Sequence, residues 1–455
     1  MSTYPNYLPG GSAGEQSFIT PFGLAFTLAM GVLMLILPRR YALLPVIALT
    51  CFMPLGEQVL VLGFHFTMLR LLVAFGWARV LVRREFVGLK LNPIDTALLW
   101  WVVSGLVVGV LLWRTSEVLV YRLGQCYNAI GMYFLFRFVV RDFDDVKRVF
   151  KITATLIVPL AAAMLLEWAT GRNVFSSLGA INPITQVRDG IVRCAGPFSH
   201  PILAGTFAAT LLPFFVALWR QGRGQGLLAG LAIFAATVII FTSGSSGPIF
   251  TLFAALLAMA MWPWRRHIRM IRYGLACALV ALHLAMKAPV WFLIARVDLL
   301  SGSTGWHRAY LIDQFIAAFP QWWLLGMKST DAFGEQIHGD ITNQYAMQGV
   351  EGGLITLVLF ILIIVRCFRG VGRFQALSEE PAAIRLYVWA MGAALFAHVL
   401  TYLSISYFDQ NFVNWYLLLA LISTMAGQFL TVRQPRPVAH QRLSSLTEIR
   451  PRSGA

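Results

Sequence analysis

The chain has 455 residues, of which 58% are hydrophobic and only 12% are charged. Because an average soluble domain carries about 25% charged residues, this composition excludes an ordinary soluble protein and indicates a membrane protein. The formal net charge of +16 also occurs in nucleic-acid-binding proteins, so the distribution of the basic residues has to decide between the two.

Apolar runs of about 17–22 residues recur along the chain, and helices of that length cross the roughly 30 Å hydrocarbon core of a bilayer. The runs lack the alternation that is typical of barrel strands. We therefore expect an all-α, polytopic integral membrane protein with about 12–13 transmembrane helices. The predicted spans are 22–37, 42–55, 63–82, 94–113, 118–139, 149–168, 199–219, 226–242, 247–263, 271–287, 351–367, 386–406 and 412–431.

Most of the 36 lysines and arginines fall in loops that this topology places on one side of the membrane. By the positive-inside rule that side is the cytoplasm, so the net charge sets the topology and predicts no nucleic-acid partner. The same alternation places loops 170–198 and 288–350 on the opposite face, which is the periplasm if the membrane is a bacterial inner membrane. We expect residues 1–432 to form one bundle and the basic tail 433–455 to be cytoplasmic and disordered.

Residues 288–350 form the longest stretch of mixed polar and apolar sequence, and we expect a large periplasmic loop there. Within it, apolar residues between Trp306 and Phe319 recur at helical spacing. This pattern predicts a short amphipathic helix at the membrane surface. Pro320 should end it, because proline cannot continue a helix.

Two arginines interrupt apolar runs. Arg70 lies within span 63–82 and Arg122 lies near the start of span 118–139. An arginine inside a membrane is costly, so such a residue faces a cavity or extends its side chain to the surface. A cavity role in substrate binding is favoured for Arg70, and both readings stay open for Arg122.

In the first outer loop, Arg193 and His200 flank a turn that contains Gly196 and Pro197. A guanidinium group there can bind a phosphate through two hydrogen bonds. Alternatively, Arg193 anchors the chain at the membrane surface and His200 caps the following helix.

The second outer loop holds further polar candidates: His307, Arg308, His338, Asp340 and Asn343. His338 or Asp340 could accept a proton beside Arg308, provided that either lies within hydrogen-bond reach of the reacting hydroxyl group. Each could equally be a solvated loop residue. The histidines and carboxylates lack the spacing of known metal motifs, and no phosphate-binding loop or dinucleotide fingerprint is present. We therefore expect no metal and no cofactor.

Several short motifs occur in the order found in one family. They are RCAGPFSHPILAG at 193–205, TSGSSG at 242–247, WHR at 306–308, and DITNQY at 340–345 followed by EGGL at 351–354. Over about 190–365 the chain resembles the O-antigen ligase and polysaccharide polymerase superfamily of bacterial membrane glycosyltransferases.

The resemblance implies a metal-independent, inverting enzyme that transfers a glycan from undecaprenyl diphosphate to an acceptor sugar hydroxyl in the periplasm. It implies that Arg193 and Arg308 hold the diphosphate, helped by Arg122 or Arg70, and that His200 and His307 contribute to the same site. Asp340 or His338 would then be the base, with Asn343 as an orienting contact. Membrane lipid, the lipid-linked oligosaccharide, the acceptor glycan and other polysaccharide assembly proteins are the implied partners.

Two positions depart from the family pattern. Ser246 stands where the family commonly has an arginine, and Thr342 stands where ligases keep a histidine. A threonine cannot act as a general base at neutral pH. These departures favour a polymerase of O-antigen or exopolysaccharide. A lipid A-core ligase, or a non-catalytic transporter of lipid-linked oligosaccharide, is the alternative.

Overall fold

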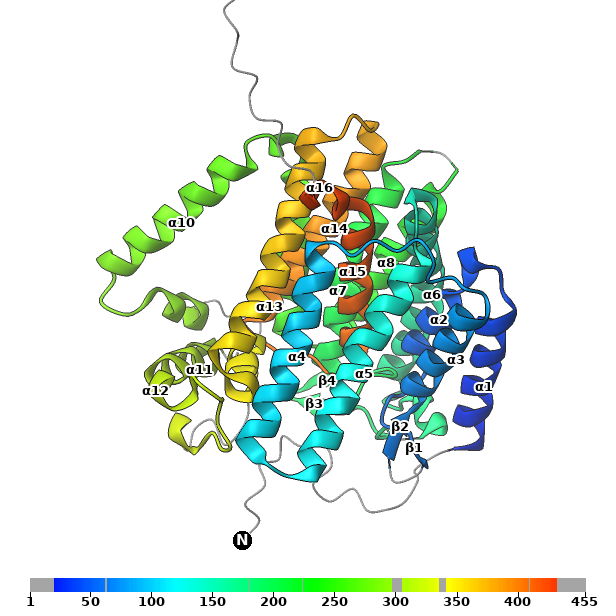
Figure 1. Ribbon diagram of the computed structural model, residues 1–455, viewed down its shortest axis with the longest axis horizontal. Coiled ribbons are helices and arrows are strands. Elements are labelled where there is room, and N and C mark those ends of the chain that lie inside the picture. Colours follow the sequence, from blue (N-terminus) through cyan, green and yellow to red (C-terminus); the bar gives the residue numbers. More distant parts are fainter. Residues whose placement is uncertain are drawn as a thin grey trace, which may run out of the picture.

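A helix overlies each of the thirteen predicted spans in the computed structural model (Figure 1), which describes residues 20–61, 64–179, 181–222, 224–296, 305–334, 341–408 and 410–431. Within these ranges, six helices are long and apolar enough to cross a membrane: α4, α6, α7, α10, α13 and α14. The thirteen helices are α1 (Pro21–Ile36), α2 (Leu44–Phe52), α3 (Met68–Val82), α4 (Pro93–Trp113), α5 (Ser116–Val139), α6 (Phe143–Thr170), α7 (Pro201–Trp219), α8 (Gly226–Thr242), α9 (Ser246–Ala260), α10 (Ile268–Ala285), α13 (Gln344–Leu377), α14 (Ala382–Thr401) and α15 (Gln410–Ala426).

The remaining described elements are short and lie in the connections. Two antiparallel hairpins occur, β1–β2 and β3–β4. Figure 1 shows both hairpins, and helices α11 and α12, toward the lower end of the bundle. The connecting elements are β1 (Gln58–Val61), β2 (Phe64–Thr67), β3 (Gln186–Arg188), β4 (Ile191–Arg193), α11 (Gly305–Ala317), α12 (Phe319–Trp322) and α16 (Gln428–Thr431). The fold is thus mostly helical, as predicted.

The predicted spans 63–82 and 42–55 are longer than the helices found there. Residues 64–67 form strand β2 and pair with β1, so α3 begins only at Met68, where Thr67 caps it by accepting a hydrogen bond from the amide of Arg70. Arg70 is therefore the third residue of its helix, whereas the predicted span places it eighth. Helix α2 has nine residues and is about 14 Å long, which is less than half the thickness of a bilayer core.

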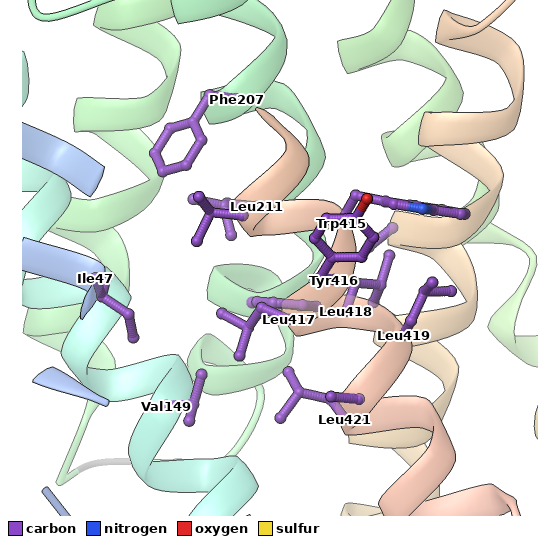
Figure 2. Close-up of a cluster of buried hydrophobic side chains, with 14 of the residues drawn as sticks. Ile47, Val149, Phe207, Leu211, Trp415, Tyr416, Leu417, Leu418, Leu419 and Leu421 are labelled. Carbon is purple, nitrogen blue, oxygen red and sulfur yellow. The ribbon is translucent and has the colours of Figure 1, made fainter. Parts of the chain in front are cut away.

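The interior of the bundle is built around α7 and α15. Figure 2 shows side chains of α15, from Trp415 to Leu421, meeting Phe207 and Leu211 of α7, with Val149 of α6 and Ile47 of α2 beside them. Both helices are apolar on nearly all sides, and a helix of this kind is stable only when other helices surround it. The central position of α7 fixes the place of its N-terminal end, which carries His200.

The predicted outer loop has a small core of its own, formed by α11, α12 and the start of α13 around Leu311, Trp322 and Phe333. It is joined to α13 where that helix is broken at Gly353, which has φ of 67°. The amide of Met327 donates to the carbonyl of Val350 (2.8 Å), and the amide of Leu354 donates to the carbonyl of Trp323 (2.7 Å). These two bonds tie the loop to the helix at the break.

The predicted amphipathic helix is confirmed as α11, which ends at Ala317, two residues before the predicted end. Pro320 follows in the first turn of α12, a position where its missing N–H costs nothing. Helix α10 behaves differently from the rest. None of its residues is buried, and Figure 1 shows it projecting away from the bundle.

Candidate functional site

The turn between α8 and α9, residues 242–247, is the point where the predicted site residues meet. Strand β4 lies directly on this turn: the amide of Cys194 donates to the carbonyl of Thr242 (2.9 Å). A Cβ atom at Gly244 would lie 2.8 Å from the carbonyl oxygen of Val192. The close approach therefore requires glycine at position 244, which also has a positive φ of 56°.

Arg193, the last residue of β4, extends over this turn. Its Nη2 donates to Oγ of Ser245 at 2.7 Å, while its Nε has no partner among the described residues. Only 8% of the residue is exposed. Ser245 is the N-cap residue of α9, but its side chain makes no capping bond to the helix. The guanidinium group therefore lies where the first amides of α9 remain uncapped.

Arg308 approaches the same turn from α11. Its Nη2 lies 3.9 Å from the position that a Cβ atom would take at Gly247, two residues after Ser245. Helix α7 contributes the third wall, because the side chain of Ile202 lies 3.2 Å from the same Cβ position. Strand β4, helix α7 and helix α11 thus converge on the start of α9, where Arg193 and Ser245 meet although they are 52 residues apart in the sequence.

The positive charges at this site have no acidic partner in direct contact among the described residues, although Asp189 acts on Arg193 from further away. Neither Arg193 nor Arg308 forms an ion pair within the described residues. Burial lowers the pKa of both guanidinium groups from the ordinary value, and the nearby Arg188 lowers that of Arg193 further. Two cations beside the N-terminal end of a helix produce a positive potential that an anion, above all a phosphate, would neutralise.

His200 caps α7 and adjoins the arginine site. Its Nδ1 accepts a hydrogen bond from the amide of Ile202 at 3.2 Å, so the neutral ring carries its proton on Nε2. Burial, and then Arg193 and Arg188, lower the pKa of His200 to about 4. The ring is therefore a neutral hydrogen-bond donor near pH 7. The helix-capping alternative for His200 is confirmed, and a role in substrate binding is compatible with it.

The low pKa of His200 gives a pH-dependent stability. The ordinary pKa of a histidine is about 6.5, whereas the pKa of His200 in the folded chain is about 4. Between these two pH values the unfolded chain binds a proton at His200 that the folded chain does not. Folding stability should therefore decrease as the pH falls through this window. We expect the thermal unfolding midpoint to fall less between pH 7 and pH 5 in the His200→Asn variant than in the wild type. Asparagine is chosen because it also caps helices. As a control, replacement of the exposed His267 by asparagine should leave the fall unchanged. An equal fall in wild type and His200→Asn would contradict this assignment.

The other two arginines form a separate group at the ends of α3 and α5. Nη1 of Arg122 pairs with Oε2 of Glu351 (3.0 Å), and its Nη2 donates to the carbonyl of Glu351 (3.0 Å). Glu351 lies in the segment of α13 just before the break at Gly353. Arg122 thus stabilises a carbonyl group of the broken helix, and a substrate contact for it stays a prediction.

Nε of Arg70 donates to Oδ1 of Asn128 at 2.9 Å, and Arg70 lies against Gly124 of α5. The structure therefore brings together Arg193, Arg308 and His200, and it pairs Arg70 and Arg122 with other residues.

The remaining predicted residues are in or beside the outer loop. His338 and Asp340 lie outside the described residues, as does the tail 433–455. Asn343 is the N-cap of α13: its Oδ1 accepts from the amides of Tyr345 (2.9 Å) and Ala346 (3.0 Å). His307 precedes Arg308 on α11, and its Nε2 is buried with no partner among the described residues.

Sequence reasoning missed the residue that holds the Arg193 segment in place. Glu167, near the end of α6, is 1% exposed and accepts hydrogen bonds from the amides of Ala195 (3.1 Å) and Gly196 (2.8 Å). Asn173 donates from Nδ2 to the carbonyl of Gly196 at 2.7 Å. A single carboxylate in an apolar run is a recognisable signal, since ionisable residues in such runs are rare unless they serve a purpose.

No protein-family model matches the chain, and no curated protein is significantly similar to it in sequence. The function must therefore be inferred from the chemistry of the site.

Proposed function

We propose that the protein is a periplasmic-face glycosyltransferase of the polymerase or ligase type, spanning a bacterial inner membrane with about 12–13 helices. It would transfer a glycan from undecaprenyl diphosphate to an acceptor sugar hydroxyl in O-antigen or exopolysaccharide synthesis. The observation that carries the proposal is the meeting of Arg193 and Arg308, neither in an ion pair within the described residues, at the start of α9.

The chemistry of such a transfer fits one buried and one half-buried arginine. The acceptor oxygen attacks the anomeric carbon of the donor, the bond from that carbon to the phosphate oxygen breaks, and lipid diphosphate leaves with the electron pair. Negative charge grows on the leaving diphosphate as the bond breaks. Preorganised cations in a site with little water stabilise that charge more than they stabilise the ground state. Arg193 and Arg308 would supply this stabilisation, and Nε2–H of His200 could donate to the same oxygens.

The acceptor hydroxyl must also lose its proton. His200 is a poor candidate, because its Nδ1 already accepts the amide of Ile202 and its pKa is lowered to about 4. Asp340 or His338 therefore remains our proposed base. Thr342 and Ser246, which depart from the ligase pattern, favour a polymerase over a lipid A-core ligase. A transporter of lipid-linked oligosaccharide is the alternative from a different class.

The test compares Arg193→Ala and Arg308→Ala with Arg188→Ala in cells that make the polysaccharide. Arg188 lies on the same hairpin but is exposed and within 3.5 Å of Asp189, so its replacement should leave the polymer intact. Loss of one charge-stabilising group typically costs about 10²–10³ in rate. We therefore expect each site variant to deplete long polymer and to accumulate single lipid-linked repeats at the periplasmic face.

The outcomes separate the candidates. Lipid-linked repeats trapped in the cytoplasmic leaflet of the Arg308→Ala strain would indicate a transporter. Unchanged polymer in both site variants would show that the arginine pair does not act in transfer, leaving only a scaffolding role. Transfer to lipid A-core without polymerisation would indicate a ligase.

A further inference from the structure

A pocket separate from the candidate site lies at the end of the bundle opposite the β hairpins, near α16 in Figure 1. It is an open pocket of about 450 Å³, lined by the loop 85–92, the C-terminal end of α5 and the junction of α15 with α16. The distribution of basic residues predicts this end to be cytoplasmic. None of the site residues discussed above contributes to its lining.

The buried floor of this pocket is electrically neutral. Asp95, fully buried, receives hydrogen bonds from Nε of Arg137 (3.1 Å), the hydroxyl of Tyr133 and Oγ of Ser423 (2.9 Å). On the other side, Glu85 binds the buried Arg79 through two hydrogen bonds of 3.0 and 2.9 Å. Each of the two lining groups Arg137 and Glu85 is therefore compensated by a buried partner of opposite charge.

Two lining cations remain, Lys90 and Arg141. Both are exposed, and neither forms an ion pair within the described part of the chain. The guanidinium group of Arg141 donates only to main-chain carbonyl oxygens, those of Phe138 and Glu85. The pocket thus carries an excess charge of about +2 at the neutral pH where both groups are ionised.

The rim of the pocket is apolar where it faces outward. Val87 is 62% exposed and Leu91 is 57% exposed, and they flank Lys90 in the same loop. Exposed apolar side chains that alternate with a cation are typical of a segment at the boundary between acyl chains and headgroups. A soluble anion would require the cations but would gain nothing from the apolar rim.

We propose that this pocket binds the phosphate-bearing headgroup of an anionic membrane phospholipid, with Lys90 and Arg141 as its charge partners and with the acyl chains passing along Val87 and Leu91. Thr424 and Gln428 also line the pocket. Basic pockets between helices at the cytoplasmic side are known to select such lipids. The site is independent of the proposed transferase activity.

The test measures lipid binding to the purified full-length protein in neutral detergent, by native mass spectrometry and by the thermal unfolding midpoint. Phosphatidylglycerol is titrated, with phosphatidylcholine and inorganic phosphate as comparisons. We expect phosphatidylglycerol alone to bind and to raise the midpoint. The double variant Lys90→Gln/Arg141→Gln should weaken that binding on the order of tenfold or more, since each basic residue near a lipid surface contributes substantially.

The matched control is Arg40→Gln/Arg266→Gln, which removes two exposed cations from other connections on the predicted cytoplasmic side. It should retain full binding. Equal losses in both double variants would show diffuse surface attraction and would overturn the pocket. An equal shift with inorganic phosphate would overturn the lipid assignment. If the double variant unfolds, the single variant Lys90→Gln, which changes only an exposed loop, is used in its place. An unchanged affinity of this variant for phosphatidylglycerol would contradict the proposal.

Discussion

Replacing Gly326 with alanine is expected to lower the free energy of unfolding by roughly 3–5 kcal/mol. A Cβ atom at this position would lie 2.1 Å from the carbonyl oxygen of Val350, and the backbone has φ of 85°. The carbonyl cannot retreat easily, because it accepts the bond from Met327 that ties the outer loop to α13. Thermal or denaturant unfolding of the purified protein measures the effect.

Gly88→Ala is the matched control, because Gly88 has nearly the same φ of 89° but no atom within 4 Å of its Cβ position. Only the cost of holding alanine in a left-handed backbone conformation remains there, about 1–2 kcal/mol. Equal losses at Gly326 and Gly88 would mean that the contact between the loop and the break in α13 contributes nothing to stability.

Replacing Glu167 with alanine is expected to lower stability by roughly 2–4 kcal/mol, because two buried amides lose their acceptors. The amides belong to Ala195 and Gly196, which directly follow the segment that carries Arg193. We therefore also expect a loss of polymer in cells that exceeds the loss of folded protein. Blotting of membrane fractions beside the polysaccharide ladder separates the two quantities.

The conservative variant Glu167→Gln keeps one oxygen acceptor and should recover part of both stability and polymer length. Glu117→Ala removes a glutamate from an exposed position in the first turn of α5 and should change neither. If Glu167→Ala reduces polymer only in proportion to folded protein, Glu167 serves the fold and does not position Arg193.

Most of the helices were predictable because a long run of consecutive apolar residues marks each of them in the sequence. The ends of the helices were less predictable. Asn343 caps α13 eight residues before the predicted start of its span, because polar residues continue a helix wherever their backbone bonds are satisfied. Residues 64–67 are apolar enough for a helix, yet they pair with 58–61 across a short connection. Strand pairing of this kind depends on a partner segment that apolarity alone does not reveal.

The candidate site was predictable by residue type but not by partner. Arg193 and Arg308 could be selected because cations in the predicted outer loops suit a diphosphate, and His200 because it flanks the same turn as Arg193. The sequence gives no means of seeing that Arg122 pairs with Glu351, 229 residues away, or that Arg193 meets Ser245. Helix α4 packs against both α5, which carries Arg122, and α13, which carries Glu351, and β4 lies on the turn before α9.

The isolation of α10 bears on how freely its sequence can change. None of its residues is buried within the described protein, so few of its side chains face a neighbour that would demand a particular shape; His283, which stacks on Trp291, is an exception. In a bilayer, fluid acyl chains accommodate leucine, valine or methionine equally well, so the order of residues in α10 is nearly free to drift while its mean apolarity is conserved. In α7, by contrast, most positions are buried against neighbouring side chains. The same exchanges there would change the stability, because a closely packed interior responds to the gain or loss of a single methyl group.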